Sequence, residues 1–220
     1  MSKTIEERLN EGRQYRDIDL GGFEHRIDEA GRKTVRGYAT TFDQPYTLWK
    51  EDGYTVMEQV DARAFDEAEM DDVIMQYNHE GRVFARMSNG TLALNADEHG
   101  LAIEADLSGT EIGRQLYEEI EGGYTNKMSF GFTVAEDRQD VTEDHDTGNV
   151  TILRTITRIR KLFDVSAVSL PANPATALSA RAYGEGVIAE AKEEIRARKA
   201  REEQKKRILE AINGDERSDH

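Results

Sequence analysis

The sequence predicts a mainly β domain with flanking helices, an α+β fold. Short runs in which apolar and polar residues alternate recur from residue 23 to residue 171, and turn-forming residues separate them. Helix-like spacing of apolar residues is limited to a few short stretches and to the C-terminal region. With 220 residues and 37% hydrophobic content, the chain can form one sizeable domain with appendages. We therefore expect a leader at 1–20, a domain at 21–182 and a charged helix and tail at 183–220.

The first sixty residues predict a leader followed by strands. Residues 1–20 are polar, and we expect a short helix or a disordered leader there. Two alternating runs, 23–27 and 34–42, flank a turn at Gly31 and predict a hairpin. A loop at 43–53 and a strand at 54–60 are expected next.

The middle of the chain predicts one short helix, four strands and a second helix. Asp61 resembles an N-cap for a helix at 62–70 with Phe65 as its core anchor. The spacing from Ser108 to Glu111 is that of a capping box, so we expect a helix from Glu111 to Glu121. The four strands expected between these helices are 73–77, 83–87, 90–95 and 101–107.

His79 follows the first of these strands directly. A histidine just past the end of a buried strand can reach into a cleft while the sheet holds its backbone. A structural role is the alternative for a lone histidine.

The stretch from Tyr124 to Val134 reads as a strand with two different faces. One face is bulky and the other is small. Ser129 lies on the small face, and Gly131 beside it leaves room for a substrate backbone. The alternative is a half-buried strand whose polar face meets water. The bulky face consists of Met128, Phe130, Phe132 and Val134, and the small face of Lys127, Ser129, Gly131 and Thr133.

A second informative stretch is 162–171, a buried strand that contains Asp164. A buried ionised carboxylate costs several kcal/mol unless it is paired, so Asp164 requires a partner. The candidates are an imidazole or one of the cations just upstream, in which case the pair would be structural. Those cations are Arg158, Arg160 and Lys161.

An acidic loop at 137–148, which contains His145, and a strand at 149–160 are expected before this stretch. After it, residues 187–212 predict a solvated helix or a weak coiled-coil segment.

Composition excludes several kinds of site. The absence of cysteine excludes disulfides, a thiolate nucleophile and cysteine-ligated metals. No run of 18 apolar residues is present, and the charged start is not a secretory signal, so neither a membrane span nor secretion is expected. The five histidines lack zinc-ligand spacing, and we expect no metal or organic cofactor. The histidines are His25, His79, His99, His145 and His220.

The net charge of −15 is unevenly distributed. Residues 41–150 contain 25 acidic and 7 basic side chains, whereas residues 184–213 contain 7 acidic and 8 basic ones. The acidic middle should repel nucleic acid and favour basic partners, although acidic surfaces also serve solubility alone. We therefore expect no nucleic-acid partner for this region.

Ser129, His79 and Asp164 are the residue types of a serine hydrolase: nucleophile, general base and orienting carboxylate. The chain from about residue 36 to residue 180 also resembles the prohead proteases of tailed bacteriophages, which share a fold with the herpesvirus assemblins. Five blocks carry the resemblance: 36–42 (RGYATTF), 78–80 (NHE), 100–105 (GLAIEA), 128–132 (MSFGF) and 164–174 (DVSAVSLPANP).

The resemblance implies a closed or nearly closed antiparallel β-barrel and a serine endopeptidase. Such a protease cuts the scaffold, or the scaffold-like arm of the major capsid protein, inside a procapsid in the cytoplasm of the bacterial host. His79 and Ser129 match the family histidine and serine, and Asp164 matches the acidic third member. Assemblins use a second histidine there, for which His145 is the weaker candidate.

By the same analogy a homodimer is implied, and the C-terminal helix would bind scaffold, be removed by self-cleavage or be a passive tail. Two alternatives remain: a non-catalytic capsid-assembly or scaffolding protein that retains the fold, and an acidic module that binds peptides by β-augmentation.

Overall fold

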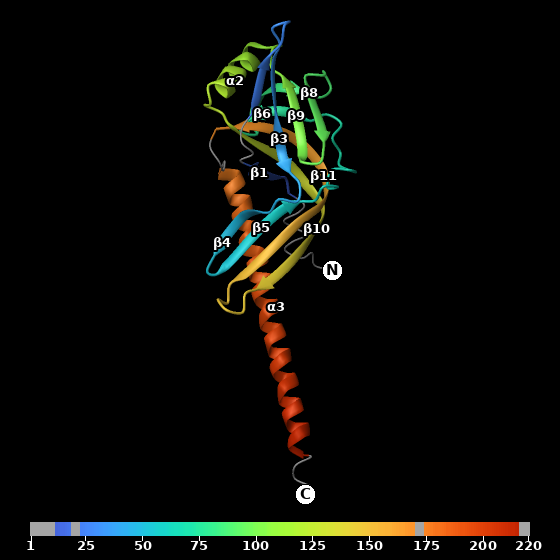
Figure 1. Ribbon diagram of the computed structural model, residues 1–220, viewed down its shortest axis with the longest axis vertical. Helices are drawn as coiled ribbons and strands as arrows, with labels where there is room; N and C mark the ends of the chain where they lie inside the picture. The colour runs from blue at the N-terminus through green and yellow to red at the C-terminus, as the bar shows by residue number, and fades with distance from the viewer. Residues whose placement is uncertain (1–11, 19–22, 170–173, 216–220) are drawn as a thin grey trace.

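The computed structural model describes residues 12–18, 23–169 and 174–215, which form two β-sheets and two helices (Figure 1). The helices are α2 (Glu111–Glu121) and α3 (Pro174–Asp215). The strands are β1 (Gln14–Ile18), β2 (Glu24–Ile27), β3 (Lys33–Thr41), β4 (Tyr46–Glu51), β5 (Tyr54–Val60), β6 (Ile74–Tyr77), β7 (Glu80–Arg86), β8 (Leu92–Ala96), β9 (Gly100–Asp106), β10 (Lys127–Glu143) and β11 (Val150–Val168).

The larger sheet has seven strands and is mixed. Its main path runs β1-β10-β11-β5-β4, and β11 also pairs with β6, which pairs with β7. The contacts of β11 with β5 and with β6 are parallel, and the other ladders of this sheet are antiparallel. The smaller sheet is antiparallel in the order β2-β3-β9-β8.

The expected closed antiparallel barrel is wrong, although the mainly β, α+β class is confirmed. The first half of β11 pairs with β5 and its last residues pair with β6, so one long strand serves two partners in parallel. In the described part of the chain no ladder joins the two sheets, which are linked by an isolated bridge between Phe42 and Val60. Within the described ranges, β2 and β8 are therefore the edge strands of the smaller sheet.

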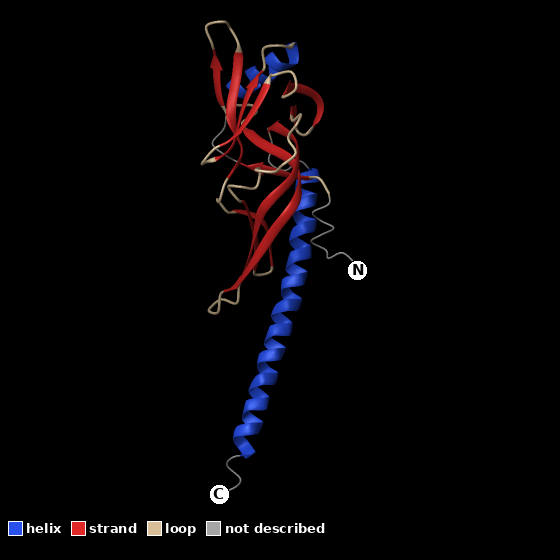
Figure 2. Cartoon of the chain, turned by 90° about the vertical axis from the view of Figure 1, so that its right-hand side faces the viewer, coloured by secondary structure: helices blue, strands red, loops and turns tan. Residues whose placement is uncertain are grey.

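The β10–β11 ribbon runs through the whole body (Figure 2). Its upper part packs in the main core between the sheets, where the predicted bulky face of Met128, Phe130, Phe132 and Val134 is buried. Its lower part forms a second apolar cluster with β5 and α3, including Ile152, Tyr183 and Val187. The two strands therefore extend from the region of Ser129 to the part of α3 that packs on the second apolar cluster.

Several local predictions differ from the structure. Residues 14–18 form strand β1 in place of a helical or disordered leader; residues 1–11 and 19–20 lie outside the described part. β4 replaces most of the loop expected at 43–53. Residues 62–67 form turns, because Asp61 accepts a hydrogen bond from the Arg63 backbone in an Asx turn, although Phe65 is buried as expected.

Two more differences concern the start of α2 and the length of β10. The N-cap of α2 is Thr110, whereas Ser108 accepts a hydrogen bond from the Lys33 backbone. β10 continues to Glu143 through the expected acidic loop, because its charged side chains lie on the exposed part of the hairpin.

Helix α3 begins at Pro174 and extends well beyond the body (Figure 1). Tyr183, Val187, Ile188 and Ala191 pack on the second apolar cluster. The expected domain boundary at 182/183 thus falls inside one helix, just before the residues that attach it to the body. No helix among the described residues is both long and apolar enough to cross a membrane.

Candidate active site

The site is built from the first residues of β10, the last residues of β11 and the tip of the β6–β7 hairpin. Ser129 is the third residue of β10, and its Cα is registered against Ser166 of β11. Gly131 is registered against Asp164, so Ser129, Gly131, Asp164 and Ser166 share one face of the sheet. This is the small face predicted from the sequence.

His79 reaches this face because Asn78 and His79 form a two-residue turn between paired Tyr77 and Glu80. Both turn residues have positive φ, 52° and 63°, as expected for the hairpin turn that matches strand twist. Asn78 N–H donates to Ala167 O (3.1 Å), and His79 N–H donates to Ser166 Oγ (3.2 Å). The turn is thereby attached to β11, and the imidazole points toward Ser129.

The three sequence-predicted residues form one hydrogen-bonded chain. His79 Nδ1 lies 2.6 Å from Asp164 Oδ1, and His79 Nε2 lies 2.5 Å from Ser129 Oγ. An ionised carboxylate only accepts, so Nδ1–H donates to Asp164, and Nε2 is free to accept the Ser129 hydroxyl proton. Ser129 and Asp164 are fully buried, and the His79 side chain is 3% exposed.

The Asp164 carboxylate has three partners. Besides His79, it accepts from Ser166 Oγ at 2.8 Å on Oδ1 and contacts the Arg13 guanidinium through Oδ2. Burial alone raises the pKa of Asp164, but the hydrogen bond and charge of His79, the Arg13 cation and the Ser166 hydroxyl outweigh burial and hold this pKa below its usual value. Asp164 is therefore ionised at neutral pH.

Strand β1 and the residue before it contribute side chains that sequence reasoning missed. Tyr15 lies against the His79 imidazole, with ring centroids 4.4 Å apart, and Arg13 packs over the rings of Tyr15 and Phe163. The sequence carried no alternation that marks this strand, because its buried residues, Gln14 and Arg16, are polar. Ser166 was also missed, although its position two residues after Asp164 places it on the same face of a strand.

Gly131 does not leave open space for a substrate backbone, contrary to the expectation. A Cβ at this position would overlap the Asp164 carboxylate and would lie 2.9 Å from Arg13 Nε. The missing side chain thus accommodates the carboxylate and the guanidinium.

The alternative partners lie elsewhere. His145 is in the turn between β10 and β11, at the opposite end of the ribbon from Ser129, so it cannot serve as the third member. Arg158 pairs with Glu136 and Glu67, and Lys161 pairs with Glu69.

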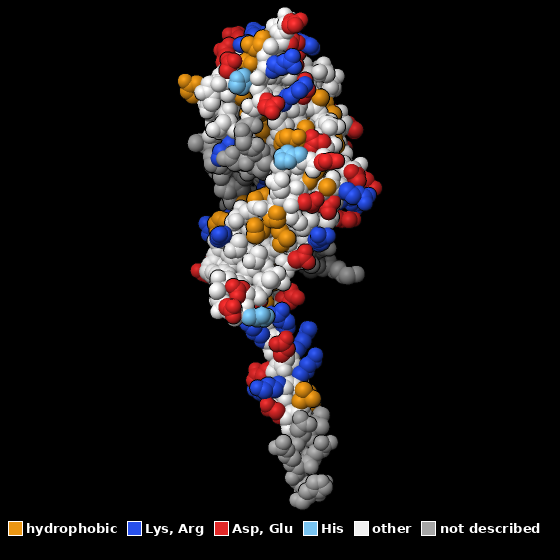
Figure 3. Space-filling model, in the orientation of Figure 1, with side chains coloured by type: hydrophobic (Ala, Val, Ile, Leu, Met, Phe, Trp, Pro, Cys, Tyr) orange, Lys and Arg blue, Asp and Glu red, His pale blue; other side chains and the backbone are white. Residues whose placement is uncertain are grey.

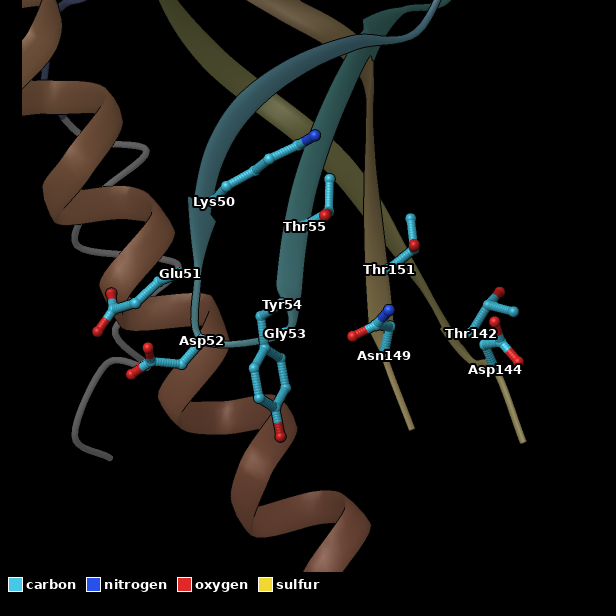
Figure 4. Close-up of a pocket in the computed structure, with 10 residues that line it drawn as sticks. All are labelled: Lys50, Glu51, Asp52, Gly53, Tyr54, Thr55, Thr142, Asp144, Asn149 and Thr151. Atoms are coloured by element: carbon cyan, nitrogen blue, oxygen red, sulfur yellow. The ribbon is translucent and has the colours of Figure 1, made fainter. Parts of the chain in front are cut away.

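A surface pocket of about 560 Å³ lies at that opposite end too, between the β4–β5 and β10–β11 hairpins (Figure 4). Its lining includes Lys50, Tyr54, Asp144 and Asn149 and none of the three candidate residues. In the described part of the chain, no group of three or more His, Asp or Glu side chains is arranged to hold a metal ion. The hydrogen-bonded chain of Asp164, His79 and Ser129 therefore defines the candidate site.

A serine, a histidine and an aspartate linked in this order define the class: a site of the serine hydrolase type on a mainly β fold. Residues 22–187 match the family model described as Caudovirus prohead serine protease. Because this match spans more than half of the chain, the protein belongs to that family, which confirms the resemblance found in the sequence.

No curated protein matches the sequence significantly. Among solved structures, the bacteriophage T4 capsid assembly protease, gp21, is similar with a TM-score of 0.41 and 12% sequence identity, covering 72% of this chain and 99% of that one.

Proposed function

We propose that this member of the prohead protease family is a serine endopeptidase that cleaves the scaffold, or a scaffold-like arm of the major capsid protein, as the procapsid matures. Membership of the family supports a role in capsid maturation. The observation that carries the proposed chemistry is the hydrogen-bonded chain from Asp164 through His79 to Ser129.

Each residue has a role that follows from its contacts. Ser129 Oγ attacks the scissile carbonyl while His79 Nε2 takes the hydroxyl proton, and the imidazolium later donates this proton to the leaving amine. Asp164 keeps the proton on Nδ1 and stabilises the imidazolium. Water then attacks the acyl-enzyme with His79 again as the base, which regenerates Ser129. Backbone N–H groups would stabilise the oxyanion by ~3 kcal/mol per donor.

The proposal also covers place and assembly. The enzyme would act within the assembling procapsid in the bacterial cytoplasm, with residues 21–182 as the protease domain. A homodimer is proposed on the resemblance to assemblins alone.

The test is co-expression with the major capsid protein and scaffold of the same phage, followed by intact-mass measurement of the products. We expect the wild-type chain to shorten its substrate and Ser129→Ala to leave it intact. Ser88→Ala, which alters an exposed serine, is the matched control and should process normally. Cleavage by Ser129→Ala at the wild-type rate would eliminate Ser129 as the nucleophile.

The full burial of Ser129 favours a second candidate, a non-catalytic capsid-assembly protein that retains the fold. A fluorophosphonate probe separates the two candidates. Covalent labelling of the wild type, and none of Ser129→Ala, supports the protease; no labelling of either supports the assembly protein.

A further inference from the structure

We propose that Arg13, the residue just before β1, is a positioning residue of this site, which orients the Asp164 carboxylate and partly offsets its negative charge. This inference rests on the proposed protease function. Arg13 lies before residue 22, outside the part of the chain that matches the family model. The proposal therefore assigns the site a residue that lies beyond the family match.

The position of Arg13 is determined by strand β1, which begins at the next residue. β1 pairs antiparallel with β10, with Tyr15 registered against Gly131 and Asp17 against Ser129. On the opposite face Arg16 is buried, and its guanidinium binds Glu58 at 2.5 and 3.0 Å. β1 is thus anchored independently of Arg13, whose side chain is one-third exposed.

Contacts on three sides orient the Arg13 guanidinium. It packs over the Phe163 ring, with Cζ 4.6 Å from the centroid, and over the Tyr15 ring at 5.1 Å. Its third contact is the ion pair with Asp164 Oδ2, in the space left by Gly131. With Oδ1 bound by His79 and Ser166, the pair with Arg13 completes the restraint on the carboxylate.

Charge gives Arg13 a second effect. A carboxylate beside an imidazole favours the imidazolium, and a cation on the same carboxylate opposes this. The groups that face the Asp164–His79 pair are Arg13 just before β1, Tyr15 of β1, Ser129 of β10 and Ser166 of β11. Lys161 lies over the Phe163 ring, 5.5 Å from its centroid, and pairs with Glu69. Among the described residues Arg13 is the cation that contacts Asp164 directly, so without it the carboxylate should favour the imidazolium more strongly.

The experiment measures the rate at which a fluorophosphonate probe labels Ser129 from about pH 5 to pH 9, the range in which a histidine base titrates. We expect Arg13→Gln to move the acidic limb of this profile upward by about half a unit to one unit and to lower the plateau rate several-fold. Arg13→Lys keeps the charge and should restore the position of the limb with a reduced plateau. Arg63→Gln, which removes an exposed arginine paired with Asp66, should match the wild type.

The outcomes are distinguishable. Labelling of the wild type together with an unshifted limb in Arg13→Gln would overturn the role of Arg13 and leave the proposed function standing. An equal shift in Arg13→Lys and Arg13→Gln would also overturn it, since loss of packing alone would then explain both. Failure of the wild type to react at every pH would overturn the proposed function and this inference with it. Thermal unfolding of each variant reports whether the fold is retained.

Discussion

Gly131 shows how a single missing side chain shapes the site. The carboxylate of Asp164 and the guanidinium of Arg13 occupy the space where a Cβ would lie. The glycine is therefore needed for the close approach of these two groups rather than for backbone flexibility.

We predict that Gly131→Ala lowers the labelling rate of Ser129 by a factor on the order of 10 to 100, because a shift of the carboxylate by about 1 Å misaligns His79. Gly109→Ala is the matched control, since a Cβ there meets nothing within 4 Å. Fluorophosphonate labelling, with thermal unfolding measured in parallel, tests this. Equal rates in the two variants would contradict the close packing described at Gly131.

At the residue scale, the members of the candidate site were predictable from the sequence, and their contacts were not. His79 after a buried strand, Ser129 on a small face and Asp164 inside a buried strand each carried a local signal. Their meeting depends on pairing between residues 50 and 85 positions apart, which local periodicity does not report. Arg13 carried no signal because its role arises from a partner 151 positions away.

At the scale of elements, β1 is held by a buried ionic network as well as by its ladder. Glu58 of β5 binds Arg16 of β1, Arg154 of β11 and the hydroxyl of Tyr46. Gln14 accepts from both arginines, and Arg154 also binds Asp137 at 2.5 Å. A polar segment that looked like a leader is thus an edge strand of the larger sheet, because Glu58 of β5 compensates the buried charge of Arg16.

The network predicts a pH dependence of stability. Burial alone raises the pKa of Glu58, but Arg16 and Arg154 lower it from 4.5 to about 2. Since the folded-state pKa is the lower one, Glu58 stabilises the fold above about pH 4.5, and this contribution is lost as the pH falls to about 2. The loss is on the order of 3 kcal/mol.

We expect Glu58→Gln to lower the free energy of unfolding at neutral pH by about 3 kcal/mol and to flatten its decline between about pH 4.5 and pH 2. Glu104→Gln, at an exposed pair with Arg36, is the control and should follow the wild type. Denaturant titrations across this pH range give the comparison. Parallel curves for wild type and Glu58→Gln would show that Glu58 gains no net stabilisation from the arginines.

Elements with strong local signals were predicted well. The expected bounds of α2 and β5 agree with the structure, because α2 has a clear apolar stripe and β5 lies between turn-forming residues, Asp52-Gly53 before it and Asp61 after it. The far half of β10 was missed since its exposed charged residues resemble a loop when their partner strand is unknown. The parallel pairing of β11 with both β5 and β6, which replaces the barrel, has no local signature at all.

For the whole molecule, α3 dominates the outline. Its 42 residues correspond to about 60 Å at 1.5 Å per residue. The part beyond the body carries acidic and basic side chains intermixed along its surface (Figure 3). Arg198 and Lys199 still reach Glu143 at the tip of the β10–β11 ribbon, and the described side chains after them are exposed.

We predict that deletion of residues 201–220 shortens the maximum dimension in small-angle X-ray scattering by about 20 Å and leaves the melting temperature nearly unchanged. Tyr183→Ala is the contrast. It removes a buried ring stacked on Arg154 and should lower the free energy of unfolding by about 3 kcal/mol. An unchanged dimension after deletion would mean that the helix does not project in solution.

The pairing of Arg13 with Asp164 also bears on synthesis and folding. The carboxylate, its imidazole and its guanidinium come from positions 164, 79 and 13, so most of the ladders around them link distant parts of the chain. Such non-local pairings form slowly, and ribosomes add about 5 to 20 residues per second. During translation β1 must wait for β10, and His79 must wait for β11. A ribosome-bound chain that has not yet exposed residue 164 holds a serine and a histidine without the strand that aligns them.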